Sequence, residues 1–199
     1  MKIVEVNAIY GTKSTGTIIA GIGAEFKKAG HTVYYATPNA PEGEQFFCFG
    51  SSFDRRCHAL LCRIFGKQGY FSHIETYKFL RWLDKTKPDI LIFVESLEKK
   101  FRYAARLSFS TKITDYLKNG KCVFAIGDKD IAPIDYFNRY DSAVTASSYD
   151  EIEEKLNYLI SNPQKIAEYS KKAFDCAYSH HNEKDLAELF KDTLTSAQL

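Results

Sequence analysis

The chain has 199 residues, of which 45% are apolar and 26% are charged, and its formal net charge is +2. This length suits one sizeable domain, and these fractions are typical of a soluble globular protein. The small net charge gives no indication of a nucleic-acid partner, and none is expected. The five cysteines are odd in number and include no C-x-x-C pair, which predicts reduced thiols and argues against a zinc site.

The location of the protein is predicted from two features of the sequence. No apolar run approaches the length of a membrane span. A strand pattern follows Met1 directly, without the regions of a secretion signal. We therefore expect a cytoplasmic protein.

The chain begins with a strand and a helix joined by a glycine-bearing loop. Residues 2–9 (KIVEVNAI) predict a buried strand, and residues 10–16 (YGTKSTG) predict a loop in which Ser14 and Thr15 cap the following helix. Because the loop is not G-x-G-x-x-G, it does not indicate a nicotinamide or flavin dinucleotide. Further strands are expected at residues 32–36, 45–49, 88–94, 121–126 and 141–145, and further helices at residues 53–65, 72–83, 112–117, 149–160, 163–178 and 183–195, with a turn or short helix at residues 131–140.

The region of residues 53–87 is basic and rich in aromatic residues, including Trp82. Such a pattern most often belongs to helices that pack their apolar sides on a sheet. The alternative is a basic amphipathic surface that contacts anionic lipid or a polyprenyl-linked acceptor at the inner face of the cell membrane. Both interpretations stay open from the sequence.

The alternation of strands and helices predicts one α/β domain, residues 1–199, with a doubly wound, Rossmann-like parallel sheet of five to six strands in the order 3-2-1-4-5-6 and helices on both faces. In that order the first strand neighbours the fourth. Glu95 and Ser96 follow the fourth strand, at the sheet edge where ligands bind. The sequence therefore predicts a crevice between the loop at Gly11–Gly16 and the segment Glu95–Lys112.

The most informative run is residues 105–127, which predicts a loop, a short helix, a stop at Asn119-Gly120 and a buried strand. Ser110 and Thr111 are N-cap types, and Lys112 follows them. Free N–H groups and a partial positive charge at a helix start favour phosphate, and these hydroxyls and this ammonium would add to both. The alternative is an ordinary capped helix whose Lys and Asp side chains are merely solvated.

The run STKITDYLKNGKCVFAIG resembles the sugar-donor helix in the C-terminal domain of GT-B glycosyltransferases of the large family 4-like group (group 1), which act in lipopolysaccharide and exopolysaccharide assembly. This resemblance implies that Ser110, Thr111 and Lys112 bind the donor diphosphate and that Asp115 binds the ribose. Glu95 aligns with the family's acidic donor-site position, although the usual E-x7-E spacing is absent. The first loop resembles V-N-x-x-x-G-x-x-S-T-G-x-I, which opens the acceptor-side domain, with matches at Gly11, Ser14, Thr15 and Gly16.

The resemblance is to a shortened member of that family. Residues 1–89 resemble the first half of the N-terminal domain and residues 90–199 the second half of the C-terminal domain, so that the seam falls near Pro88-Asp89-Ile90. A natural deletion and a chimera both explain this. Glycosyl transfer needs a closed site that stabilises the leaving diphosphate, which the family's two-domain cleft supplies. We therefore expect binding of a nucleotide sugar or nucleoside diphosphate and leave hexosyl transfer open.

Neither a cofactor nor a metal is expected, because residues 105–127 contain no Asp-x-Asp dyad that would hold a divalent cation against the diphosphate. The adjacent His180-His181 is predicted to face solvent in a loop. The alternative function is a non-catalytic Rossmann-like scaffold or interaction module, which forms a homodimer through the surface of the missing part. A phosphoacceptor or flavodoxin-like module is a third hypothesis, supported only by Asp128 and Asp130.

Overall fold

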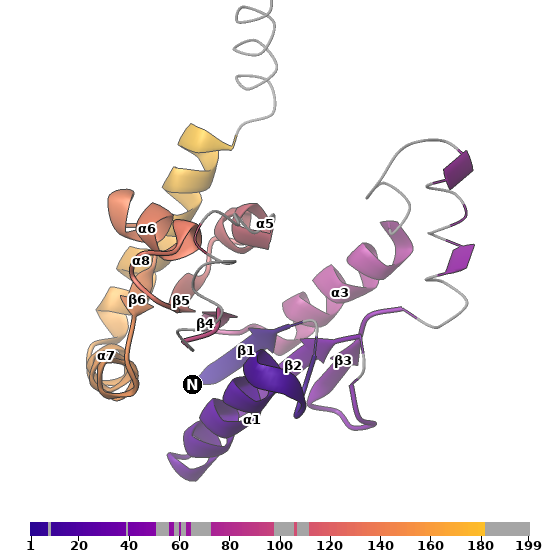
Figure 1. The fold of residues 1–199 in the computed structure, drawn as a ribbon, viewed down its shortest axis with the longest axis horizontal. Helices are drawn as coiled ribbons and strands as arrows, with labels where there is room; N and C mark the ends of the chain where they lie inside the picture. Colours follow the sequence, from indigo (N-terminus) through magenta and orange to yellow (C-terminus); the bar gives the residue numbers. More distant parts are fainter. Residues whose placement is uncertain are drawn as a thin grey trace, which may run out of the picture. The chain divides into compact units, whose positions relative to one another are not determined.

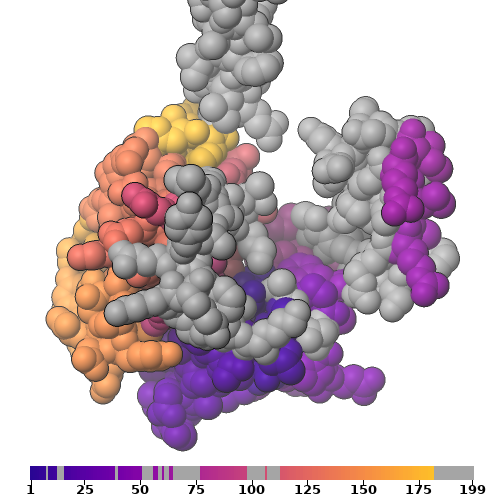
Figure 2. Space-filling view, viewed as in Figure 1, coloured from indigo at the N-terminus to yellow at the C-terminus, as the bar shows by residue number. Residues whose placement is uncertain are grey.

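The computed structural model describes residues 1–7, 9–38, 40–50, 56–57, 60, 63–64, 73–97, 106 and 112–181, and the remaining residues are grey in Figures 1 and 2. The side chains of residues 13–15, 73–76 and 112 also lie outside this description. The strands are β1 (Lys2–Val6), β2 (Thr32–Thr37), β3 (Phe46–Cys48), β4 (Ile90–Val94), β5 (Cys122–Ile126) and β6 (Val144–Ala146). The helices are α1 (Lys13–Lys28), α3 (His73–Thr86), α5 (Lys112–Lys118), α6 (Ala132–Arg139), α7 (Tyr149–Ser161) and α8 (Pro163–His180).

The six strands form one sheet in the order β3-β2-β1-β4-β5-β6. β1 pairs in parallel with β2 and with β4, β2 pairs in parallel with β3, and β5 pairs in parallel with β6. The Rossmann-like α/β fold and the strand order predicted from the sequence are therefore confirmed. The chain divides into two units, Met1–Ser96 and Leu97–Leu199, which are described separately below.

The first unit carries helices on both faces of its strands (Figure 1). Neighbouring residues of a strand point to opposite faces. The ring of Tyr34 lies 5.9 Å from the ring of Trp82 on α3, whereas Tyr35 lies against Gly23 on α1. α1 and α3 therefore cover opposite faces of β2.

The predicted seam at Pro88-Asp89-Ile90 is the place where β4 is tied to the start of β1. The backbone N–H of Lys2 donates to the Asp89 carboxylate at 2.8 Å, and the N–H of Asp89 donates to the carbonyl oxygen of Lys2 at 2.8 Å. These two bonds align β4 beside β1, where Val4 pairs with Leu91.

The second unit is built around β5, all of whose residues are buried. α8 packs against both β5 and α5. α7 begins after Ser148, whose Oγ accepts from the N–H of Glu151 at 3.2 Å, while the Glu151 carboxylate accepts from the N–H of Ser147 at 2.8 Å. The two bonds resemble a capping box, except that Glu151 accepts from the N–H of Ser147 rather than from that of the N-cap residue Ser148.

Several predicted boundaries shift, each for a local reason. β1 ends at Val6 rather than at residue 9. β6 begins at Val144 rather than at Asp141, because Asp141 has a φ of 47° and the N–H of Ser142 bonds back to the carbonyl of Phe137, which places both residues in the turn after α6. α8 continues to His180 and His181 is its C-cap, so the prediction of a loop is wrong for His180 but not for His181.

Parts of the sequence interpretation fall outside the described residues. These are the predicted helix at residues 183–195, most of the one at residues 53–65, and Cys62. Within the described part of the chain, Cys48, Cys57, Cys122 and Cys176 are free thiols.

Candidate functional site

The carboxyl ends of β1 and β4 form the best-defined candidate site of the first unit. β1 lies between β2 and β4, and Glu5 of β1 pairs with Ile92 of β4, so the two strands end at the same edge. In open parallel sheets, ligands bind outside the carboxyl ends of the strands where the strand order reverses. The loop after β1 and the residues Glu95 and Ser96 after β4 occupy this position.

The loop after β1 is closed by its two glycines. Gly11 has a φ of +71°, and its N–H donates to the carbonyl oxygen of Gly16 at 3.0 Å. A Cβ atom at Gly16 would lie 3.1 Å from the carbonyl oxygen of Ile9, which is closer than most side chains allow. A glycine is therefore favoured at both positions, for conformation at Gly11 and for space at Gly16.

The start of α1 differs from the prediction. The N-cap is Thr12, which has an extended backbone and makes no side-chain cap hydrogen bond, and the helix begins at Lys13. Ser14 and Thr15 therefore lie inside the first turn rather than capping it. Their side chains are outside the described residues, so their proposed part in binding stays a prediction.

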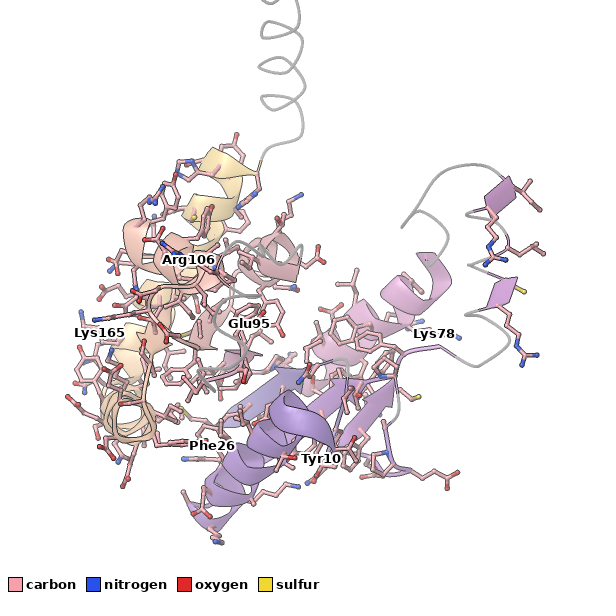
Figure 3. The ribbon with its side chains drawn as sticks, in the orientation of Figure 1. Tyr10, Phe26, Lys78, Glu95, Arg106 and Lys165 are labelled. Atoms are coloured by element: carbon pink, nitrogen blue, oxygen red, sulfur yellow. The ribbon has the colours of Figure 1, made fainter. Side chains whose placement is uncertain are left out.

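Two polar residues end β4 at this edge. Glu95 is half-buried, and the Ser96 side chain is nearly buried, with 9% of its surface exposed. Glu95 is labelled in Figure 3, together with Tyr10, which follows β1. The first unit thus brings Glu95 to the same strand edge as Gly11 and Gly16, as the sequence predicts.

A buried carboxylate lies beneath this edge, and sequence reasoning missed it. Glu5 is 1% exposed, and neither of its carboxylate oxygens has a hydrogen-bond partner among the described residues. Burial raises the pKa of Glu5 well above its ordinary value of 4.5, and the ammonium of Lys27 on α1 offsets this only partly. Burial therefore favours the protonated form of Glu5 over its carboxylate.

Tyr35, which neighbours Glu5, belongs to a cluster of aromatic side chains on the α1 side. Tyr35 pairs with Glu5 across the strands, and burial, Glu5 and Tyr10 all raise the pKa of the Tyr35 phenol. The Tyr10 ring lies 4.7 Å from the Tyr35 ring and 5.2 Å from the Phe46 ring. The ring of Tyr10 thus holds the loop after β1 against Tyr35, the neighbour of the buried Glu5.

In the second unit, the helix predicted at residues 112–117 is present as α5. It begins at Lys112 and is held by Ile113, Tyr116 and Leu117, all of which are buried. Asp115 lies on its exposed side, where partial screening from water raises the pKa of the carboxyl group and Lys118 lowers it. The predicted helix is confirmed, and the ribose-binding role of Asp115 stays a prediction.

The groups expected to hold the diphosphate are not described. Ser110 and Thr111 lie outside the described residues, as does the side chain of Lys112. Their role therefore stays a prediction. Within the described residues, no group of three or more His, Cys, Asp or Glu side chains is placed to hold a metal ion.

The basic region contributes an exposed face of α3. Tyr77 and Leu80 are 61% and 44% exposed, and the guanidinium of Arg81 lies 5.8 Å from the centre of the Tyr77 ring. Lys78, labelled in Figure 3, is exposed beside them. The opposite side of α3 packs Phe79 and Trp82 onto Phe47 of β3, as the alternative of a helix packed on the sheet predicts.

The chain was compared with known proteins. No protein-family model matches it, and no curated protein matches it significantly. Among the described residues, no helix combines the length and apolar composition that crossing a bilayer requires.

Proposed function

We propose that the protein binds nucleoside diphosphates and nucleotide sugars at the start of α5, as the sugar-donor part of a glycosyltransferase-like site. Ser110, Thr111 and Lys112 would contact the diphosphate, and Asp115 would accept hydrogen bonds from the ribose hydroxyls. The observation that carries the proposal is that α5 begins at Lys112 and leaves Asp115 at its surface one turn later. The resemblance assigns Lys112 to the diphosphate of the ligand and Asp115 to its ribose.

Hexosyl transfer is a further step that binding does not require. The transition state of glycosyl transfer carries positive charge on the sugar, and departure of the diphosphate needs a dry site with fixed donors. The family resemblance covers only half of the sequence of a two-domain enzyme. We therefore propose that binding is stronger than turnover.

The test is calorimetric titration of the full chain with uridine and guanosine diphosphates. A charge-assisted contact to phosphate contributes about 1.5–3 kcal/mol, so Lys112→Ala should weaken binding roughly tenfold or more. Asp115→Asn should weaken nucleoside diphosphate binding more than pyrophosphate binding, because pyrophosphate has no ribose. Lys129→Ala removes an exposed lysine of the same unit and is the matched control.

Two results would end the proposal. One is no detectable binding at millimolar ligand, and the other is equal affinity for Lys112→Ala and the unchanged protein.

The alternative of an interaction module is favoured by exposed aromatic residues on α8, where Phe174 and Tyr178 are 52% and 71% exposed. An increase in particle size with concentration, together with no nucleotide binding, would support that alternative.

We also propose that the exposed face of α3, defined by Tyr77, Lys78, Leu80 and Arg81, contacts anionic lipid. Its support is the combination of exposed aromatic and aliphatic side chains with cations on one helix surface. Such surfaces bind at the level of lipid headgroups without crossing the bilayer.

A further inference from the structure

Three helices of the second unit meet at one histidine. His181, the C-cap residue after α8, places Nε2 2.8 Å from Oη of Tyr136 on α6 and Nδ1 3.4 Å from Oγ1 of Thr114 on α5. Oη of Tyr136 lies 3.5 Å from Sγ of Cys176, which is on α8. Cys176, Tyr136, His181 and Thr114 therefore form a continuous chain of hydrogen bonds that crosses from α8 through α6 to α5.

The imidazole is held in this position from several sides. The backbone N–H of His181 donates to the carbonyl oxygen of Ala177 at 2.9 Å and so continues the bonding of α8. The Tyr136 ring lies 5.6 Å from the His181 ring, and Cys176 beneath it is buried. The side chain of His181 is thus placed by the end of its own helix and by α6.

The donor and acceptor roles along this series of hydrogen bonds favour a neutral His181 ring. In one arrangement each group donates to the next: the Cys176 thiol to Oη of Tyr136, the Tyr136 hydroxyl to Nε2 of His181, and Nδ1–H of His181 to Thr114. A protonated ring carries hydrogen on both nitrogens, so Tyr136 must accept from Nε2 instead. Its own proton then turns toward the thiol sulfur, which is a weak acceptor.

Burial and nearby positive charges also favour the neutral ring of His181. Burial, the neighbouring His180 and the ammonium of Lys118 on α5 all lower the pKa of His181 from its ordinary value of 6.5. On the α6 side the ring meets the phenol of Tyr136, whose Oη also lies 3.5 Å from the Cys176 thiol of α8. Asp115 is the acidic residue of α5, so its titration has to be separated from that of His181 by experiment.

We propose that His181 is a proton-sensitive latch: its neutral ring links α5 to α6 and α8, and its protonation reverses the bond to Tyr136 on α6 and adds a positive charge that Lys118 on α5 repels, which loosens α5. Because the folded-state pKa is lowered, the stabilisation is complete above the ordinary histidine pKa and is lost as the pH falls through the folded-state value. α5 is the helix that carries Lys112 and Asp115. The latch does not depend on the proposed function, since it acts on α5 without any ligand.

Hydrogen–deuterium exchange of peptides from α5, corrected for the intrinsic effect of pH, tests the latch on the ligand-free chain between pH 5 and pH 8. A peptide from α7 is the internal control. In the unchanged protein, protection of α5 should fall about fivefold to thirtyfold toward acid pH, as expected when one hydrogen bond is weakened and one repulsion between like charges is added. Protection of α7 should not follow this change.

Two substitutions at the same position separate the latch from a merely structural role. The amide of His181→Gln can accept from Tyr136 and donate to Thr114 but does not titrate, so protection of α5 should stay high at every pH. His181→Ala should lose this protection at every pH. Asp115→Asn should keep the pH dependence of the unchanged protein, because Asp115 is not part of the hydrogen-bonded chain.

The proposal would be overturned if His181→Gln kept the same pH dependence of α5 protection as the unchanged protein. It would also be overturned if His181→Ala left α5 protected at pH 8. A proton NMR titration that gave His181 a pKa at or above 6.5 would contradict the preference for the neutral ring.

Discussion

Replacing Glu5 is the sharpest test of how the first unit is held together. Glu5 is buried on β1, has no hydrogen-bond partner among the described residues, and has a raised pKa. Glu5→Gln keeps the shape and removes the ionisable group. Glu5→Met keeps a similar volume and also removes the polar atoms.

The sign of the effect follows from proton binding. Because the folded-state pKa of Glu5 lies above the unfolded-state value near 4.5, the folded protein holds a proton that the unfolded chain releases. The free energy of unfolding is therefore largest below the unfolded-state pKa. It falls by about 1.4 kcal/mol per pH unit as the pH rises between the two pKa values.

The two substitutions should behave differently. Glu5→Gln should abolish this slope. Glu5→Met should in addition raise the free energy of unfolding at pH 7 by about 1–3 kcal/mol, which is the usual penalty of an unsatisfied buried polar group. If Glu5 instead formed a buried ion pair, its removal would destabilise the protein by about 3–5 kcal/mol.

Urea unfolding followed by tryptophan fluorescence at several pH values measures both quantities. The single tryptophan, Trp82, lies on α3 and packs against Tyr34, so it reports on the unit that contains Glu5. Glu25→Gln is the control, because Glu25 is exposed and pairs only with Lys28 at the surface in the described part of the chain. An unchanged slope in Glu5→Gln, or a destabilised Glu5→Met, would refute the reasoning.

Two further outcomes are expected in the first unit. The Cβ atom of Gly23→Ala would overlap the hydroxyl of Tyr35. The substitution should therefore lower the free energy of unfolding by about 1–3 kcal/mol, despite the better helix propensity of alanine. An equal loss of stability in the unchanged and Tyr35→Phe backgrounds would contradict this cause. Reversing the charges of Lys78 and Arg81 should reduce cosedimentation with phosphatidylserine vesicles at least tenfold, since each cation near such a surface contributes about 1 kcal/mol. Equal sedimentation of that variant and of Lys129→Glu would count against lipid contact through α3.

The strands and their order could be predicted because their sequences leave little choice. The runs ILIFV of β4 and CVFAI of β5 are apolar at every position, which is typical of strands covered on both faces. Crossovers between parallel strands are right-handed, which limits the arrangements of a chain with alternating strands and helices. Local helix signals also sufficed for α7, which follows Ser148, an N-cap residue type with Glu151 three positions later.

The residues that were missed depend on contacts between distant segments. Within KIVEV, Glu5 has the pattern of a solvated position, and only the packing of α1 over that face of the sheet shows that it is buried. His181 reads as a solvent-facing loop residue, because its partners Tyr136 and Thr114 lie 45 and 67 positions earlier in the chain. Neither burial nor pairing of this kind leaves a periodic signal in the sequence.

The lengths of the edge strands restrict how two copies of this chain can associate. β3 and β6, the outermost strands in the sheet order, have three residues each, whereas the strands between them have five or six. An outer strand this short offers few unpaired backbone groups to an incoming strand, which is how many proteins avoid aggregation through sheet edges. A homodimer of this protein would therefore have to form through helix surfaces rather than by extending the sheet.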